Sequence, residues 1–126
     1  MKKLSIIILY VEDQQRSTLF YETVLHQKPL LNVPGMSEFL LNENFKLGLM
    51  PEKGIAQILC PHAPSPQLGN GIPRCELYLI VDDPEKSLEL AIEAGAKLIS
   101  KSAQRDWGDT VSYCVDYDGH VIAFAK

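Results

Sequence analysis

The chain lacks the features that mark membrane, nucleic-acid-binding and disulfide-stabilised proteins. No apolar run approaches the roughly 18 residues of a membrane span, so we expect no membrane-spanning segment. The net charge is −4, with 12 Lys and Arg against 16 Asp and Glu and no basic cluster, which argues against nucleic acid and anionic membranes as partners. Cys60, Cys75 and Cys114 include no C-x-x-C pair, and their odd number favours reduced thiols in a cytoplasmic protein.

The first half of the chain predicts a strand, a helix and three further strands. Residues 4–11 are apolar and lead into Glu12-Asp13 without a small-residue cleavage site, so we interpret them as a strand rather than a signal peptide. Asp13 is expected to cap a helix that extends to about Leu25, because its carboxylate can accept free N–H groups of the first helical turn. Three strands are predicted to follow, at residues 30–33, 37–41 and 45–50.

The middle of the chain is rich in proline and glycine and shows no hydrophobic period. We interpret residues 52–72 as a linker between a first module, residues 1–51, and a second module, residues 73–126. Residues 55–59 are the one segment here that could add a short strand to a sheet edge. The prolines favour a semi-rigid connection.

The second half repeats the order of the first. Asp83-Pro84 is expected to start a helix and Gly95 to end it, and Asp118-Gly119 predicts a tight hairpin turn. An offset of 70 residues superposes Asp13 on Asp83, which relates the two halves as βαβββ modules. The predicted class is α+β, with the modules forming a shared curved mixed sheet that encloses a cleft and carries the helices outside. The strands of this half are expected at residues 74–81, 96–100, 111–116 and 121–126.

Several short motifs then give the chain a family resemblance. They are Val11-Glu12-Asp13, Val81-Asp82-Asp83, Trp107-Gly108 and the ending Asp116-Tyr117-Asp118-Gly119-His120. Together with the paired βαβββ pattern, they resemble the vicinal oxygen chelate superfamily, in its glyoxalase, bleomycin-resistance and dioxygenase branch. The resemblance covers essentially the whole chain and implies a single glyoxalase/bleomycin-resistance-like domain, residues 1–126, that forms a homodimer. His26 departs from the family pattern, which usually has glycine after the first helix.

The resemblance also implies where a catalytic metal would bind. Metal enzymes of this family take one His, Glu or Gln ligand from the first and the last strand of each module. The matching positions here are Ile6, Gly48, Glu76 and Ala123, and only Glu76 could bind a metal. The prediction is therefore that no metal site and no cofactor are present, with a divalent metal as the alternative. His120 is expected to pack against the hairpin or cap it, and it is the first candidate ligand if the alternative holds.

Strand alternation proposes the side chains that would line the cleft. Tyr78 shares a strand face with Glu76, and the repeat places Ile8 and Tyr10 on the equivalent face. Trp107, on a loop, is either an aromatic lid or a core plug. Glu76 is either an anchor for a ligand or a partner of an arginine. The predicted ligand-binding residues are Ile8, Tyr10, Phe39, Glu76, Tyr78, Trp107 and Tyr113, and Glu76 is the one catalytic candidate.

Three functions remain open from the sequence. The first is a metal-free protein that binds a small aromatic or cationic molecule in its aromatic cleft, as in the bleomycin-resistance branch. The second is a metal-dependent lyase or isomerase of the glyoxalase I type. The third is a metal-free enzyme with Glu76 as general base. Whether any reaction is catalysed, lactoylglutathione-lyase-like or dioxygenase-like, does not follow from the residues.

Overall fold

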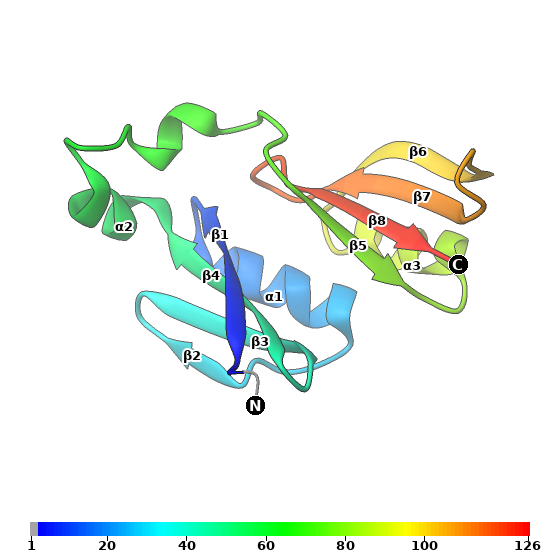
Figure 1. The fold of residues 1–126 in the computed structure, drawn as a ribbon, viewed down its shortest axis with the longest axis horizontal. Coiled ribbons are helices and arrows are strands. Elements are labelled where there is room, and N and C mark those ends of the chain that lie inside the picture. Colours follow the sequence, from blue (N-terminus) through cyan, green and yellow to red (C-terminus); the bar gives the residue numbers. More distant parts are fainter. Residues whose placement is uncertain (1–2) are drawn as a thin grey trace. The chain divides into compact units, whose positions relative to one another are not determined.

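The structure is a computed structural model that describes residues 3–126 and divides into two compact units, the first ending at Asn70 and the second beginning at Gly71 (Figure 1). Each unit contains a four-stranded mixed sheet with a helix packed on one of its faces. The predicted α+β class with two βαβββ modules is confirmed. In the described part of the chain, no helix has the length and apolar character needed to cross a bilayer.

Unit 1 follows the predicted element order closely. The Asp13 side chain accepts a hydrogen bond from the Arg16 amide and caps the helix as expected. The helix ends at His26, which adopts the left-handed φ of 54° that glycine usually supplies, so the departure from the family pattern leaves this exit in place. The elements are β1 (Ser5–Val11), α1 (Gln14–Leu25), β2 (Leu31–Val33), β3 (Met36–Asn42) and β4 (Phe45–Pro51), with sheet order β1-β4-β3-β2.

The region predicted as a linker contains two helical segments. Helix α2 spans Glu52–Leu59 and a short 3-10 helix, η1, spans Pro66–Gly69, and both belong to unit 1. The proposed edge strand at residues 55–59 is therefore wrong. Ile55 is buried and α2 packs on β4 and β1, so tertiary contact with the sheet stabilises a helix too short to stand alone.

Unit 2 repeats the connectivity of unit 1. Asp83 caps its helix by accepting from the Lys86 amide, with Pro84 at the first helical position as predicted. Gly119 adopts a φ of +88° in the predicted hairpin turn. The elements are β5 (Glu76–Ile80), α3 (Pro84–Glu93), β6 (Lys97–Gln104), β7 (Thr110–Val115) and β8 (Val121–Ala125), with sheet order β5-β8-β7-β6.

The strand order of unit 2, β5-β8-β7-β6, matches the order β1-β4-β3-β2 of unit 1 element for element, so the repeat seen in the sequence is confirmed in three dimensions. In both units the first strand pairs in parallel with the last strand. The strand order puts the first strand at one edge of the sheet. The shared sheet and the cleft between modules stay predictions.

Candidate functional site

The two faces of the sheet in unit 2 have different partners. The Ser112 hydroxyl donates to the Pro84 carbonyl of α3 at 3.0 Å, so Ser112 lies on the helix side, and its neighbours Val111 and Tyr113 lie on the opposite face. The strand register places Tyr78 next to Ala123, which is also the partner of Tyr113. Alternation along β5 adds Glu76 to the face opposite α3. The predicted residues Glu76, Tyr78 and Tyr113 are thus brought to one face.

Trp107 joins this face through a hydrogen-bonded chain. Its indole Nε1 donates to the Tyr78 hydroxyl at 2.8 Å, and that hydroxyl donates to Oδ2 of Asp109 at 2.6 Å. Trp107 is 59% exposed, so it is not a core plug. Because its polar end is held by this hydrogen bond, the exposed indole ring keeps few alternative orientations.

The phenol of Tyr78 keeps its proton at neutral pH. Its pKa is raised, first by desolvation and second by the hydrogen bond to the Asp109 carboxylate, with the Trp107 hydrogen bond acting in the opposite direction. A protonated hydroxyl is required for Tyr78 to donate to Asp109 while it accepts from Trp107. Asp109 is a residue that sequence reasoning missed, because its distance from Tyr78 in the chain hides their contact.

Arg105 covers the ring of Tyr113. Its guanidinium carbon lies 5.1 Å from the ring centroid, within the range of a cation–π contact. Its Nη2 donates to the Val111 carbonyl and to the Ser100 hydroxyl, both at 2.8 Å. Arg105 therefore fastens the loop that carries Trp107 to β6 and β7, rather than serving only as a solvated surface ion.

Glu76 is exposed, and it makes no ion pair within residues 3–126. The arginine expected beside it on the chain, Arg74, donates instead to the Ile72 carbonyl at 3.0 Å and contacts the His120 ring at 3.2 Å. The carboxylate of Glu76 therefore adds negative charge to the face that carries the aromatic side chains.

The residues predicted in unit 1 separate onto two faces of its sheet. Ile8 lies opposite Gly48 and Tyr10 opposite Met50, and both are partly buried. Phe39 pairs instead with Leu47, is 0% exposed and lies on the α1 side, where its neighbour in alternation, Ser37, bonds to α1. The expected placement of Phe39 with Ile8 is therefore wrong. A large apolar side chain is needed there to fill the layer between sheet and helix.

The four family metal positions do not supply a metal's donor set. Ile6 and Ala123 offer no donor atom, and Glu76 is the only carboxylate among them. Gly48 has no side chain, and a Cβ built there would lie 2.5 Å from Cδ1 of Ile8. A ligand side chain at position 48 would therefore have to displace Ile8, and the residues of this chain do not fit the family's ion.

A different group of possible metal ligands occurs in the hairpin turn after β7. Atoms of Asp116, Asp118 and His120 lie within 4.8 Å of one another, and all three side chains are buried. Their alternate spacing in the sequence is the signal for such a group, of which the sequence predicted only His120 as a possible ligand. The hydrogen bonds within the turn already use several of the atoms that could bind a metal.

Asp116 holds the turn together. Its Oδ1 accepts from the amides of Asp118 and His120, both at 2.9 Å, and its Oδ2 lies 2.8 Å from Nδ1 of His120. Because arginine is only a donor, the contact of Arg74 with His120 Nε2 makes that nitrogen an acceptor, so Nδ1 carries the proton donated to Asp116. Both ring nitrogens are engaged and a permanent cation faces one of them. The prediction that His120 caps the hairpin is confirmed.

The three cysteines are free thiols. Burial and the nearby Asp116 carboxylate raise the pKa of Cys114 to about 12. Burial also raises the pKa of Cys75, against the lowering effect of Arg74. Cys75 and Cys114 therefore stay protonated at neutral pH and are poor nucleophiles.

Comparisons with known proteins agree with this architecture. The glyoxalase-like domain model matches residues 4–126. A glyoxalase-related enzyme from Fulvimarina pelagi has a similar structure, with a TM-score of 0.80, 20% identity, and coverage of 99% of this chain and 88% of that one. A glyoxalase/bleomycin resistance protein/dioxygenase family enzyme from Burkholderia phytofirmans PsJN has a TM-score of 0.81, 18% identity and 98% coverage of both chains.

A hypothetical protein from S. aureus is also similar, with a TM-score of 0.78, 18% identity, and coverage of 99% of this chain and 93% of that one. No curated protein matches the chain. At these identities the structural likeness shows the fold, and the family model shows the family. Because that model covers nearly the whole sequence, the chain belongs to the glyoxalase-like domain family of the vicinal oxygen chelate superfamily.

Proposed function

We propose that this protein binds a small aromatic cation without a metal, on the face of unit 2 that carries Trp107, Tyr78 and Tyr113. The observation that carries the proposal is the chain from the Trp107 indole through the Tyr78 hydroxyl to the Asp109 carboxylate, with distances of 2.8 and 2.6 Å. It holds an exposed ring in one orientation beside an anionic group. Stacking on such a ring gains dispersion and burial energy at low entropic cost.

The charges on this face favour a cation over an anion. Glu76 and Asp109 supply two carboxylates, whereas Arg105 supplies one guanidinium, which is held by the Val111 carbonyl, the Ser100 hydroxyl and the Tyr113 ring. Aromatic faces attract cations through the negative potential over the ring. A planar cationic ring system therefore combines both attractions, and an anionic ring system of the same size meets repulsion.

Proflavine, a planar tricyclic cation, is expected to quench the emission of Trp107 in a saturable titration, because Trp107 is the only tryptophan in the sequence. Anthracene-2-carboxylate, an anion of similar shape, is expected to bind at least about tenfold more weakly, a difference of about 1.4 kcal/mol. Isothermal titration calorimetry checks both affinities independently of emission. Equal affinity for the two dyes, or no saturation with proflavine, would contradict the proposal.

The variant Tyr78→Phe tests the orienting chain within the same titration. It removes the hydroxyl that links Trp107 to Asp109, and the loss of about 1 kcal/mol from such a hydrogen bond predicts about fivefold weaker proflavine binding. Tyr117→Phe is the matched control, since Tyr117 is also exposed but its hydroxyl donates to the Ala94 carbonyl at the end of α3. Equal affinities of the two variants would show that the chain does not orient the binding ring.

Metal content separates this proposal from the metal-dependent lyase or isomerase. The donor set at the four family positions contains a single carboxylate, so we expect well below about 0.1 ion per chain after dialysis against Ni, Zn, Mn, Fe and Co in turn. Elemental mass spectrometry gives the value. A result near one ion per chain or per dimer would overturn the metal-free proposal, and His120→Ala would then show whether the hairpin turn holds the ion.

A further inference from the structure

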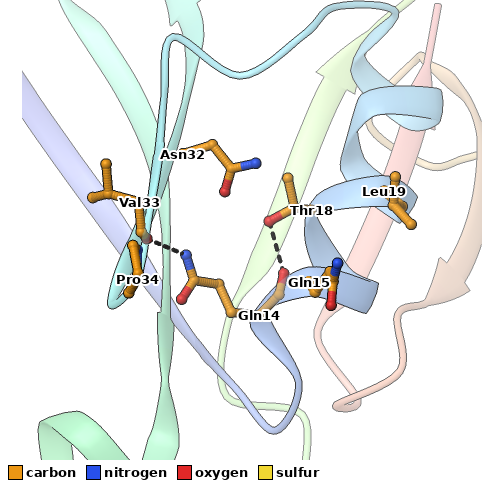
Figure 2. A pocket seen from close by; sticks show the side chains of 7 residues that line it. All are labelled: Gln14, Gln15, Thr18, Leu19, Asn32, Val33 and Pro34. Atoms are coloured by element: carbon orange, nitrogen blue, oxygen red, sulfur yellow. Dashed lines mark hydrogen bonds between the residues drawn. The ribbon is translucent and has the colours of Figure 1, made fainter.

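A second candidate binding site lies in unit 1, between the first turns of α1 and the β2–β3 hairpin (Figure 2). The pocket has a volume of about 450 Å³, within the range of small-molecule sites in proteins. None of the residues predicted from the sequence to bind a ligand lines it. It is therefore independent of the aromatic face in unit 2.

Gln14 fixes the two walls of this pocket relative to each other. Its side-chain amide nitrogen donates to the Val33 carbonyl at 2.8 Å and to the Ser37 hydroxyl at 2.9 Å, and its oxygen accepts from the Gly35 amide at 3.0 Å. Figure 2 shows the Gln14 side chain reaching from the helix start to the hairpin. All the hydrogen-bonding groups of this amide except one lone pair are used, so Gln14 shapes the pocket rather than binding a ligand.

Asn32, an exposed residue, supplies a donor that no other group of residues 3–126 uses. Its Oδ1 accepts from the Ser37 hydroxyl at 3.0 Å, which fixes the orientation of the carboxamide. In that orientation its Nδ2 points across the pocket toward α1, and it makes no hydrogen bond within residues 3–126 (Figure 2). The Ser37 hydroxyl is held in turn by Thr18 at 2.8 Å, so the donor is positioned by a chain of contacts that reaches the helix.

The remaining lining carries no charge. Among residues 3–126, no Asp, Glu, Lys, Arg or His lines the pocket, so an ionic ligand would gain no counter-charge there. Leu19, which is 61% exposed, and Val33 and Pro34 offer an apolar wall on either side. The exposed carboxamide of Gln15 adds a second donor and acceptor at the rim.

From this arrangement we infer that the pocket binds a neutral, planar heterocycle that carries a carboxamide-type edge. The edge places an acceptor opposite Asn32 Nδ2, and the ring packs between Leu19 and the Val33-Pro34 corner. The site stands on unit 1 alone and does not depend on the function proposed for unit 2.

Nicotinamide and nicotinate form the test pair, because they share a ring and differ in whether the edge is a neutral amide or a carboxylate. In ¹⁵N-labelled protein, nicotinamide is expected to shift the backbone amides of Gln15, Leu19, Asn32 and Val33 in a saturable titration. Nicotinate is expected to bind at least about tenfold more weakly. A titration up to about 50 mM nicotinamide detects dissociation constants above about 1 mM. Absence of saturable shifts at these residues over that range would overturn the inference. Equal affinity for the two compounds would also overturn it.

Two variants assign the binding to the named groups. Asn32→Asp keeps the shape and the acceptor for Ser37 but replaces the Nδ2 donor by a charged oxygen, so nicotinamide affinity should fall at least about tenfold. Asn44→Asp makes the same chemical change at an exposed turn and should leave the affinity unchanged. Leu19→Ala removes one apolar wall at an exposed position and should weaken binding about threefold while the spectrum elsewhere stays intact. Unchanged affinity in both pocket variants would show that nicotinamide binds elsewhere.

Discussion

Asp116→Ala is expected to lower the free energy of unfolding of unit 2 by about 4 kcal/mol, because three buried donors lose their acceptor and each costs about 1–3 kcal/mol. The variant would leave the amides of Asp118 and His120 and the ring Nδ1 of His120 without their acceptor in the buried hairpin turn. Denaturant titration followed by the emission of Trp107 measures the change, because the only tryptophan lies in this unit.

The matched control is Asp106→Ala, the same substitution at an exposed aspartate one residue from Trp107. It is expected to change stability by less than about 0.5 kcal/mol. If Asp116→Ala fell within the same limit, the carboxylate would not hold the turn, and the arrangement of His120 between Asp116 and Arg74 would have to be reconsidered.

Gly119→Ala is expected to cost about 3 kcal/mol through two effects that act together. The φ of +88° is unfavourable for any residue with a Cβ. That Cβ would also lie 2.9 Å and 3.0 Å from the Cα and carbonyl carbon of Gly71, backbone atoms that cannot rotate away. Relief would require the turn to move from Gly71, whose amide donates to the Asp118 carbonyl at 3.2 Å.

Gly108→Ala separates strain from crowding. Gly108 has a similar φ of +102° in the same unit, but a Cβ there meets nothing within 4 Å. Its expected cost is the conformational strain alone, about 1–2 kcal/mol. Unfolding followed by far-ultraviolet circular dichroism compares the two variants. Equal costs would mean that the hairpin turn yields readily and that its approach to Gly71 contributes little.

The local order of this chain follows from short-range chemistry, which is why it could be predicted. Asp13 and Asp83 cap helices through hydrogen bonds to amides three residues away, and Gly119 forms the turn because its own backbone favours that φ. Strand alternation likewise placed Glu76 and Tyr78 on one face, since side chains two residues apart on a strand point the same way.

The tertiary structure decided what local preference leaves open. Helix α2 forms in a segment that looked like a linker because its apolar side chains pack on β4 and β1. Phe39 faces α1 because the layer beneath that helix needs a large apolar side chain, a demand that its own strand does not reveal.

Both candidate sites also depend on tertiary contacts that local sequence preference does not reveal. Trp107 was recognisable as a loop aromatic, but its bond to Tyr78, 29 residues away, and the bond from Tyr78 to Asp109 exist only after β5 and the Trp107 loop are brought together. The donor of Asn32 is directed by Ser37 and Thr18 from two other elements. The sequence by itself determined the βαβββ order of elements in each unit and the alternation of side chains along each strand. Hydrogen-bond partners were decided by tertiary structure, because they depend on distances through space between segments far apart in the chain.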